Sequence, residues 1–175
     1  MAALLIAAGA ILLAVVLAIA LVLGDRGGSP GGAGAIANPV ALRGVGAYDP
    51  PPGDGQEHDA AAPRATDGNE ATYWETSTYR YPDGGLGKPG VGLVLDAGRA
   101  VTLHRLVVTT DTPGFTARIR AGDSPTGPFR FVSGPQTVSK STTFDLENAQ
   151  ARYFVVWITN LGTHSQVHVN EVVAG

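Results

Sequence analysis

The segment Ala65–Thr76, ATDGNEATYWET, is the part of the sequence whose residue types are best suited to chemistry. Asp67, Gly68 and Asn69 are typical of a tight turn, and the acidic, amide and hydroxyl side chains around them are rich in oxygen donors. Such a turn can bind a metal ion through those oxygens, or it can be an Asx turn that binds none. The residues alone leave both alternatives open. Trp74, which follows the turn, is predicted to lie in the core beneath it.

Glu171 is a second residue whose position suggests chemistry. In QVHVNEVV, Val167 and Val169 share one face of a strand, and a period of two places Glu171 on the same face, which should be the buried one. A carboxylate in an apolar interior costs on the order of several kcal/mol unless it is paired, protonated or bound to a cation. The pattern therefore predicts a partner for Glu171, unless the strand ends by residue 170 and the carboxylate points into water.

A further acidic cluster consists of Asp49, Asp54 and Glu57 in the Pro/Gly-rich segment YDPPPGDGQE. These residues can contribute to the same site as Asp67 or to another one. Turn-rich segments usually carry their charges in solvent, so the favoured interpretation is a set of solvated turn carboxylates.

The sequence has no motif of a known catalytic site in a fitting context. The four histidines are scattered and form no HExxH pattern, and the kinase signatures are missing. The one Gly-x-Ser-x-Gly match, GGSPG at residues 27–31, lies in the Gly/Ala/Pro-rich stretch and has no strand before it, so it is not a nucleophile elbow. The absence of cysteine excludes disulfide bonds, thiolate zinc sites and a cysteine nucleophile. A net charge of −3 without a basic cluster argues against nucleic acid as a partner. The sequence thus predicts a chain that is not an enzyme.

The elements that must position these residues are short strands. No long stretch has helical periodicity, and the apolar runs are β-branched and separated by Gly and Pro. The runs predicted as strands are GVGLVLDAG, LHRLVVTTD, FTARIRAGD, FRFVSG, STTFDL, RYFVVWITN and VHVNEVVAG. Seven or more such strands at hairpin spacing predict an all-β antiparallel sandwich or barrel.

The N-terminal part of the chain is apolar and predicts a membrane anchor. Residues 2–23 contain no charged or strongly polar side chain, and about 22 helical residues span about 33 Å, enough to cross a hydrocarbon core of about 30 Å. A cleaved signal peptide usually has a shorter apolar region that follows Lys or Arg. We therefore predict a single transmembrane helix at residues 1–23, a flexible Gly/Ala/Pro linker at residues 24–44 and a folded domain at residues 45–175.

Several of these motifs, in this order, resemble a known family. ATDGNEATYWET, GVGLVLDAG and the terminal VHVNEVVAG together look like discoidin-like domains, also called coagulation factor V/VIII C-type or galactose-binding-like domains. YDPPPGDGQEHDAAAPRATDGNEATYWETSTY followed by KPGVGLVLDAG is similar to the extracytoplasmic C-terminal domains of actinobacterial serine/threonine kinases and of MviN-type lipid II flippase-like proteins. The resemblance covers residues 48–174. It implies an antiparallel jelly-roll sandwich on the extracytoplasmic side of the cell membrane.

The resemblance also implies a structural calcium ion near the point where the two ends of the domain meet. The matching ligands are the side chains of Asp67, Asn69, Thr72 and Glu171, with backbone carbonyls near Arg64 and Thr72. A set made only of oxygen donors suits calcium better than zinc or copper.

Jelly rolls of this family bind ligands in loops at one end, where aromatic rings stack on sugars and Arg or His groups bond hydroxyls. The candidate residues are Tyr79, Arg80 and Tyr81 in TYRYPDGG, Phe115 after a Pro-Gly turn, and His164 in NLGTHSQ. We expect a non-catalytic module that recognises carbohydrate or cell-wall glycan. The alternative is a protein-interaction or spacer domain of a membrane-bound protein that does not bind sugar.

Overall fold

The computed structural model describes residue 36 and residues 38–175 except 148. The predicted transmembrane helix and most of the predicted linker lie outside the described residues. Within the described residues, no helix has the length and apolar character needed to cross a bilayer. The compact unit Ala35–Gly175 contains all the described core residues, so it has a hydrophobic core of its own.

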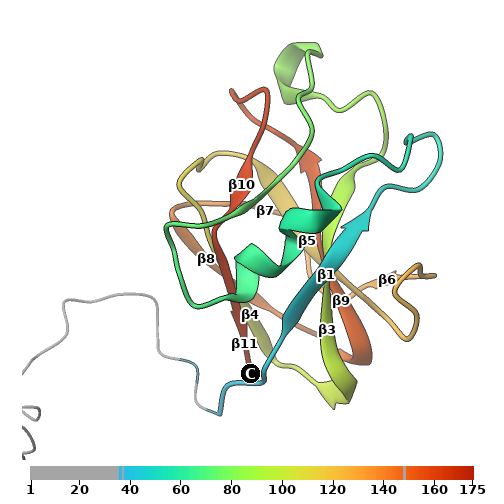
Figure 1. The fold of residues 1–175 in the computed structure, drawn as a ribbon, viewed down its shortest axis with the longest axis vertical. Helices are drawn as coiled ribbons and strands as arrows, with labels where there is room; N and C mark the ends of the chain where they lie inside the picture. The colour runs from blue at the N-terminus through green and yellow to red at the C-terminus, as the bar shows by residue number, and fades with distance from the viewer. Residues whose placement is uncertain (1–35, 37, 148) are drawn as a thin grey trace, which may run out of the picture. The chain divides into compact units, whose positions relative to one another are not determined.

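Two antiparallel sheets form the body of this unit (Figure 1). The larger sheet has the order β1 (Arg43–Tyr48), β3 (Val91–Thr102), β9 (Gln150–Asn160), β5 (Thr116–Gly122), β6 (Arg130–Phe131), and β7 (Gln136–Thr137) also pairs with β5. The smaller sheet has the order β11 (Glu171–Ala174), β4 (Arg105–Thr109), β8 (Ser141–Asp145), and a separate ladder joins β2 (Trp74–Glu75) to β10 (His168–Val169). Every pair is antiparallel, which confirms the predicted all-β antiparallel architecture.

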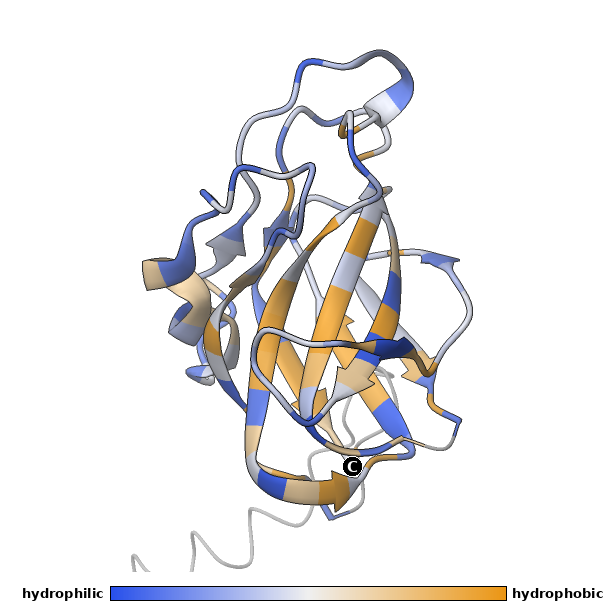
Figure 2. Ribbon diagram, turned by 90° about the vertical axis from the view of Figure 1, so that its right-hand side faces the viewer, coloured by the Kyte–Doolittle hydropathy of each residue, from blue (hydrophilic) through white to orange (hydrophobic). Residues whose placement is uncertain are grey.

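Strand β9 shows how the apolar runs build the core. Its Phe154, Val156 and Ile158 are fully buried between the sheets. The alternate residues Val155 and Trp157 are also buried, because Tyr48 and Phe129 cover the outer face of the larger sheet with a second apolar cluster. Both faces of β9 are therefore shielded from solvent. This explains its continuous apolar sequence and the apolar centre of the sheet in Figure 2.

Five elements lie outside the predicted strands: β1, β2, β7 and the 3₁₀-helices η1 (Asp59–Thr66) and η2 (Pro82–Gly84). Helix η1 packs closely on β1, where a Cβ on Gly44 would come within 2.0 Å of the carbonyl oxygen of Ala62. The folded unit also begins before the predicted boundary at residue 45, because Val40 already pairs with Ala174.

The loops that follow β2 and β9 lie at one end of the sandwich, and the C-terminus lies at the other end (Figure 1). The first loop contains the short helix η2 (Pro82–Gly84). Leu161 N donates a hydrogen bond to Gly84 O at 2.7 Å, and a Cβ on Gly84 would lie 2.4 Å from the oxygen of Gly162. The two loops are thus packed backbone against backbone, which fixes the side chains that they carry.

Candidate functional site

The turn from Asp67 to Thr72 gathers oxygen atoms around one hydroxyl group. Thr72 Oγ1 lies 3.0 and 2.8 Å from the two carboxylate oxygens of Asp67, 2.9 Å from the carbonyl oxygen of Asn69 and 3.3 Å from that of Arg64. Asp67 Oδ1 also accepts a hydrogen bond from Asn69 N at 2.9 Å, which makes an Asx turn. One hydroxyl proton cannot satisfy four acceptors, so the turn has an excess of lone pairs.

Glu171 reaches this turn from β11, but not in the predicted way. Val172 and Ala174 face the core and Val173 is exposed, so Glu171 lies on the outer face and the prediction that it points inward is wrong. The alternation shifts at Asn170, which is itself buried and donates to Glu70 O at 2.9 Å. Glu171 is half-buried all the same, and its Oε2 accepts a hydrogen bond from Gly68 N at 2.9 Å.

The carboxylates of Glu171 and Asp67 lie close enough at this turn to repel each other. Burial raises the pKa of Glu171 above its ordinary value, and the charges of Asp67 and Glu70 raise it further, against the opposing hydrogen bond from Gly68. Among the described residues, neither Asp67 nor Glu171 forms an ion pair.

Of the predicted calcium ligands, the Asp67 carboxylate, the Thr72 hydroxyl and the Arg64 carbonyl oxygen lie together, with the carbonyl oxygen rather than the side chain of Asn69. Glu171 reaches the same turn through Gly68 N. The described residues contain no group of three or more His, Asp or Glu side chains arranged for a metal ion. Two carboxylates with carbonyls and a hydroxyl suit a hard cation such as calcium and do not suit zinc. The donor set fits calcium, and calcium itself stays a prediction.

A groove of about 470 Å³ lies at the loop end of the sandwich. It is lined by Tyr79, Arg80, Tyr81, Asp83, Gly84, Gly162, Thr163, His164 and Ser165. The groove brings together four of the five predicted ligand residues, from two loops about eighty positions apart. Phe115 is the exception: it is fully buried in the core, so it has no surface to offer a ligand and its prediction is wrong.

Tyr81 is the most exposed large apolar side chain at this end, with 57% of its surface accessible. Its ring lies against Gly87, where an added Cβ would fall 2.3 Å from Tyr81 Cζ, and Gly87 has a φ of +67° that favours glycine. One face of the ring is therefore supported by backbone while much of the ring remains accessible to solvent.

A second groove of about 270 Å³ shares Tyr79 and Tyr81 with the first and is also lined by Asp54, Glu57 and Lys88. Lys88 Nζ forms ion pairs with Asp49 at 2.5 Å and with Glu57 at 3.2 Å. All three side chains are nearly inaccessible, at 8%, 2% and 1% exposed for Lys88, Asp49 and Glu57. The interpretation of Asp49 and Glu57 as solvated carboxylates is wrong, and it holds only for the exposed Asp54.

This ion-pair network extends to Tyr79, whose hydroxyl donates to Glu57. Burial raises the pKa of Tyr79, and the hydrogen bond to Glu57 adds to the increase, so the phenol stays neutral. Burial alone would lower the pKa of Lys88, but its hydrogen bonds to Asp49 and Tyr79 raise it above the ordinary value. The network was not predicted: Lys88 is one of only two lysines in the chain, but its partners Asp49 and Glu57 lie 39 and 31 positions before it.

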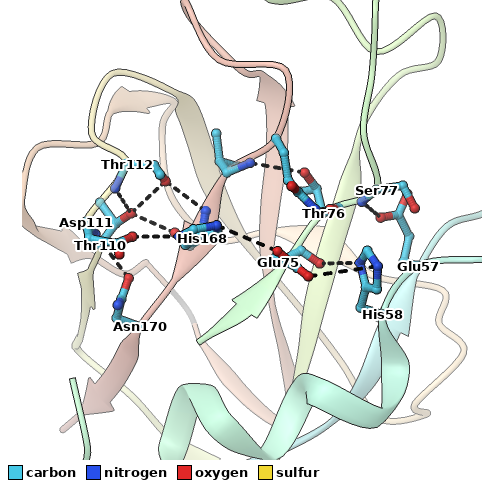
Figure 3. A network of polar contacts seen from close by, with 12 residues as sticks. Glu57, His58, Glu75, Thr76, Ser77, Thr110, Asp111, Thr112, His168 and Asn170 are labelled. Atoms are coloured by element: carbon cyan, nitrogen blue, oxygen red, sulfur yellow. Dashed lines mark hydrogen bonds and ion pairs between the residues drawn. The ribbon is translucent and has the colours of Figure 1, made fainter. Parts of the chain in front are cut away.

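Polar contacts tie His168 to the loop at residues 110–112 and to Glu75, and tie Ser77 to Glu57 (Figure 3). His168 stacks on Tyr73 with ring centroids 3.8 Å apart, and its two ring nitrogens face Asp111 at 2.8 Å and Glu75 at 3.7 Å. Beyond it, the backbone N–H of Ser77 donates to Glu57 at 2.6 Å. These contacts fix residues 75–77, which precede the first groove loop, against β10 and Glu57.

Neither the family models nor the curated proteins with which the chain was compared give a match. Solved structures do. Chitosan-binding module 1 of a chitosanase/glucanase from Paenibacillus sp. IK-5 has a TM-score of 0.60 and 17% identity over 79% of this chain and 99% of its own. The Clostridium perfringens module CpGH89CBM32-5, in complex with GalNAc-β-1,3-galactose, has a TM-score of 0.57 and 17% identity over 78% and 99%.

The fold is that of carbohydrate-binding modules. This agrees with the galactose-binding-like, discoidin-like resemblance; the closer similarity to kinase and MviN-type domains stays a prediction. A GH29 fucosidase from Ruminococcus gnavus also matches, with a TM-score of 0.50 and 14% identity over 65% of this chain, but the match covers only 22% of the fucosidase. The neighbours that match along most of both chains are thus modules rather than whole enzymes.

Proposed function

We propose that this chain is a non-catalytic carbohydrate-binding module whose sugar site is the groove around Tyr81. The observation that carries the proposal is the Tyr81 ring, which is more than half exposed and backed by Gly87. Sugar rings have an apolar face that stacks on such a platform, and a rigid aromatic ring loses little conformational entropy on binding.

The polar residues beside Tyr81 complete the proposed site. Arg80 offers hydrogen-bond donors, Asp83 offers acceptors, and Thr163 offers a hydroxyl of either role, all within the same groove. A site of this kind, with one apolar platform and several convergent polar groups, matches the hydroxyl pattern of a sugar. The carbohydrate-binding modules with the same fold support this assignment.

The test is a glycan array probed with residues 35–175, followed by calorimetry on the best ligand. We expect saturable binding that Tyr81→Ala weakens by about tenfold or more, because the stacking surface is lost. Phe131→Ala is the matched control, since Phe131 is another aromatic side chain that is about half exposed, at 49%, and lines neither groove. Glycan binding that is indifferent to Tyr81→Ala would move the site elsewhere. If no glycan binds and a membrane protein co-purifies with the chain, the alternative of an interaction or spacer domain stands.

We propose in addition that calcium stabilises the domain through Asp67, Thr72 and Glu171 and the carbonyl oxygens of Arg64 and Asn69. A cation there would offset the repulsion between two carboxylates from distant parts of the chain. We also propose that residues 2–23 anchor the module in the cell membrane with its folded part outside. Protease treatment of intact cells should then digest residues 36–175 while residues 2–23 stay with the membrane fraction.

A further inference from the structure

The two grooves beside Tyr81 carry more negative than positive charge. Asp54 lines one groove and Asp83 the other, and both side chains are exposed. Beneath them lie the buried Asp49 and Glu57, and the cations of this region are Lys88 and Arg80. Four carboxylates against two cations leave a net charge of −2 around the ring of Tyr81.

The buried part of this charge acts on a ligand more strongly than surface charges do. One ammonium group, Lys88, serves two carboxylates that are almost fully enclosed, so one negative charge beneath the grooves has no partner within the network. Tyr79 does not supply a compensating charge, because it is neutral. Charges that are out of reach of counter-ions are screened less than exposed ones.

His164 adds an acceptor to the first groove. Its Nε2 lies 2.9 Å from the carbonyl oxygen of Pro113, and because a carbonyl oxygen only accepts, Nε2 carries the proton. In the neutral ring, Nδ1 is then an acceptor. Together with Asp83 and the electron-rich face of Tyr81, the groove offers three kinds of group that attract an ammonium ion.

Resting on the function proposed above, we infer that the grooves around Tyr81 select sugars that bear a free, protonated amino group over their N-acetylated or acidic counterparts. The ammonium group of such a sugar lies beside Asp54 or Asp83 while the ring stacks on Tyr81. An N-acetylated sugar stacks equally well but gains nothing from the charge, and a uronic acid is repelled by it.

The test compares three oligosaccharides of equal length with residues 35–175: an oligomer of glucosamine, its fully N-acetylated form and an oligomer of a uronic acid. Calorimetry at a pH where the amine is protonated should give the glucosamine oligomer about five- to tenfold tighter binding than the acetylated one, and no measurable binding of the uronic acid. Added salt should reduce this preference.

The double variant Asp54→Asn, Asp83→Asn should reduce the ratio of the affinities for the glucosamine oligomer and the acetylated oligomer, because only the buried carboxylates then attract the amine. An unchanged ratio would overturn the inference. Asn tolerates the left-handed φ of 56° at Asp83, so the loop is kept. Asp145→Asn, Glu147→Gln removes two carboxylates that line neither groove and should change nothing.

Equal affinities for the amine and the acetylated oligomer, both weakened by Tyr81→Ala, would overturn the inference and leave the sugar site in place. The same holds if none of the three oligomers binds but another glycan binds in a Tyr81-dependent way. Failure of every glycan would overturn both the inference and the proposed function.

Discussion

Two pairs of carboxylates in this domain are held in opposite ways. Asp49 and Glu57 are buried at the loop end around the ammonium group of Lys88, so their neutralising cation belongs to the chain. Asp67 and Glu171 face each other across the oxygen-rich turn, and no side-chain cation among the described residues pairs with them. The difference teaches that the first pair shares a cation supplied by the chain, while the second has none among the described side chains, which is why we propose that it takes one from solution.

Removing the internal cation should have the largest effect. Lys88→Met leaves two buried carboxylates without a partner, and we expect a loss of about 3–5 kcal/mol in the free energy of unfolding, measured by urea denaturation. Arg105→Met is the control, because it breaks an ion pair with Asp145 whose side chains are 65% and 86% exposed, and it should cost less than about 1 kcal/mol. Equal costs for the two variants would show that the Lys88 network contributes no more than a surface pair.

Adding the external cation should have the next largest effect. Calcium at a hundred times its dissociation constant stabilises a folded protein by about 2.7 kcal/mol, and we expect it to raise the melting temperature of residues 35–175 accordingly. The double variant Asp67→Ala, Glu171→Ala should not respond to calcium or to EDTA. Lys88→Met, although destabilised, should keep the full response. A calcium response that survives in the double variant would place the ion elsewhere.

The smallest effect is a pH dependence in the absence of calcium. The folded-state pKa of Glu171 is raised from its ordinary value of 4.5, mainly by burial. Below pH 4.5 the carboxyl group is protonated in both the folded and the unfolded state, so it does not affect the free energy of unfolding. As the pH rises toward the folded-state pKa, the unfolded chain loses its proton first, which disfavours folding. Between pH 4 and pH 7, the free energy of unfolding of the natural chain should therefore fall, relative to that of Glu171→Gln, by less than about 1 kcal/mol.

Urea denaturation of both proteins in EDTA measures this difference. Saturating calcium should reverse it, because the ionised carboxylate then becomes a ligand. A natural chain that gains stability over Glu171→Gln with rising pH in EDTA would mean that Glu171 already has a cationic partner in the protein.

The sequence predicted the strands well because their apolar runs are long and continuous. Strand β1 was missed because RGVGAY is short of apolar residues, and η1 because Pro63 and a run of alanines give it no helical face. Both elements are fixed by their contact with each other, where Gly44 meets Ala62, and a single sequence does not contain that contact.

The candidate site was predictable to the extent that it depends on loop position. Tyr79, Arg80, Tyr81 and His164 were candidates because the resemblance implies ligand binding in loops by aromatic, Arg and His groups, and the structure places all four on one groove. The direction of Glu171 was missed because a buried Asn170 shifts the alternation by one residue. The Lys88 network joins residues 31 and 39 positions apart, so only the folded chain brings them together.

The pairing of Val40 with Ala174 has a practical consequence for how the module meets its target. It brings both ends of the folded unit to the end of the sandwich opposite the loop that contains η2 (Figure 1). A biotin group or a fused protein attached at residue 175 thus leaves the grooves open to solution, so a biosensor chip coated in this orientation measures the same affinity as the free molecule.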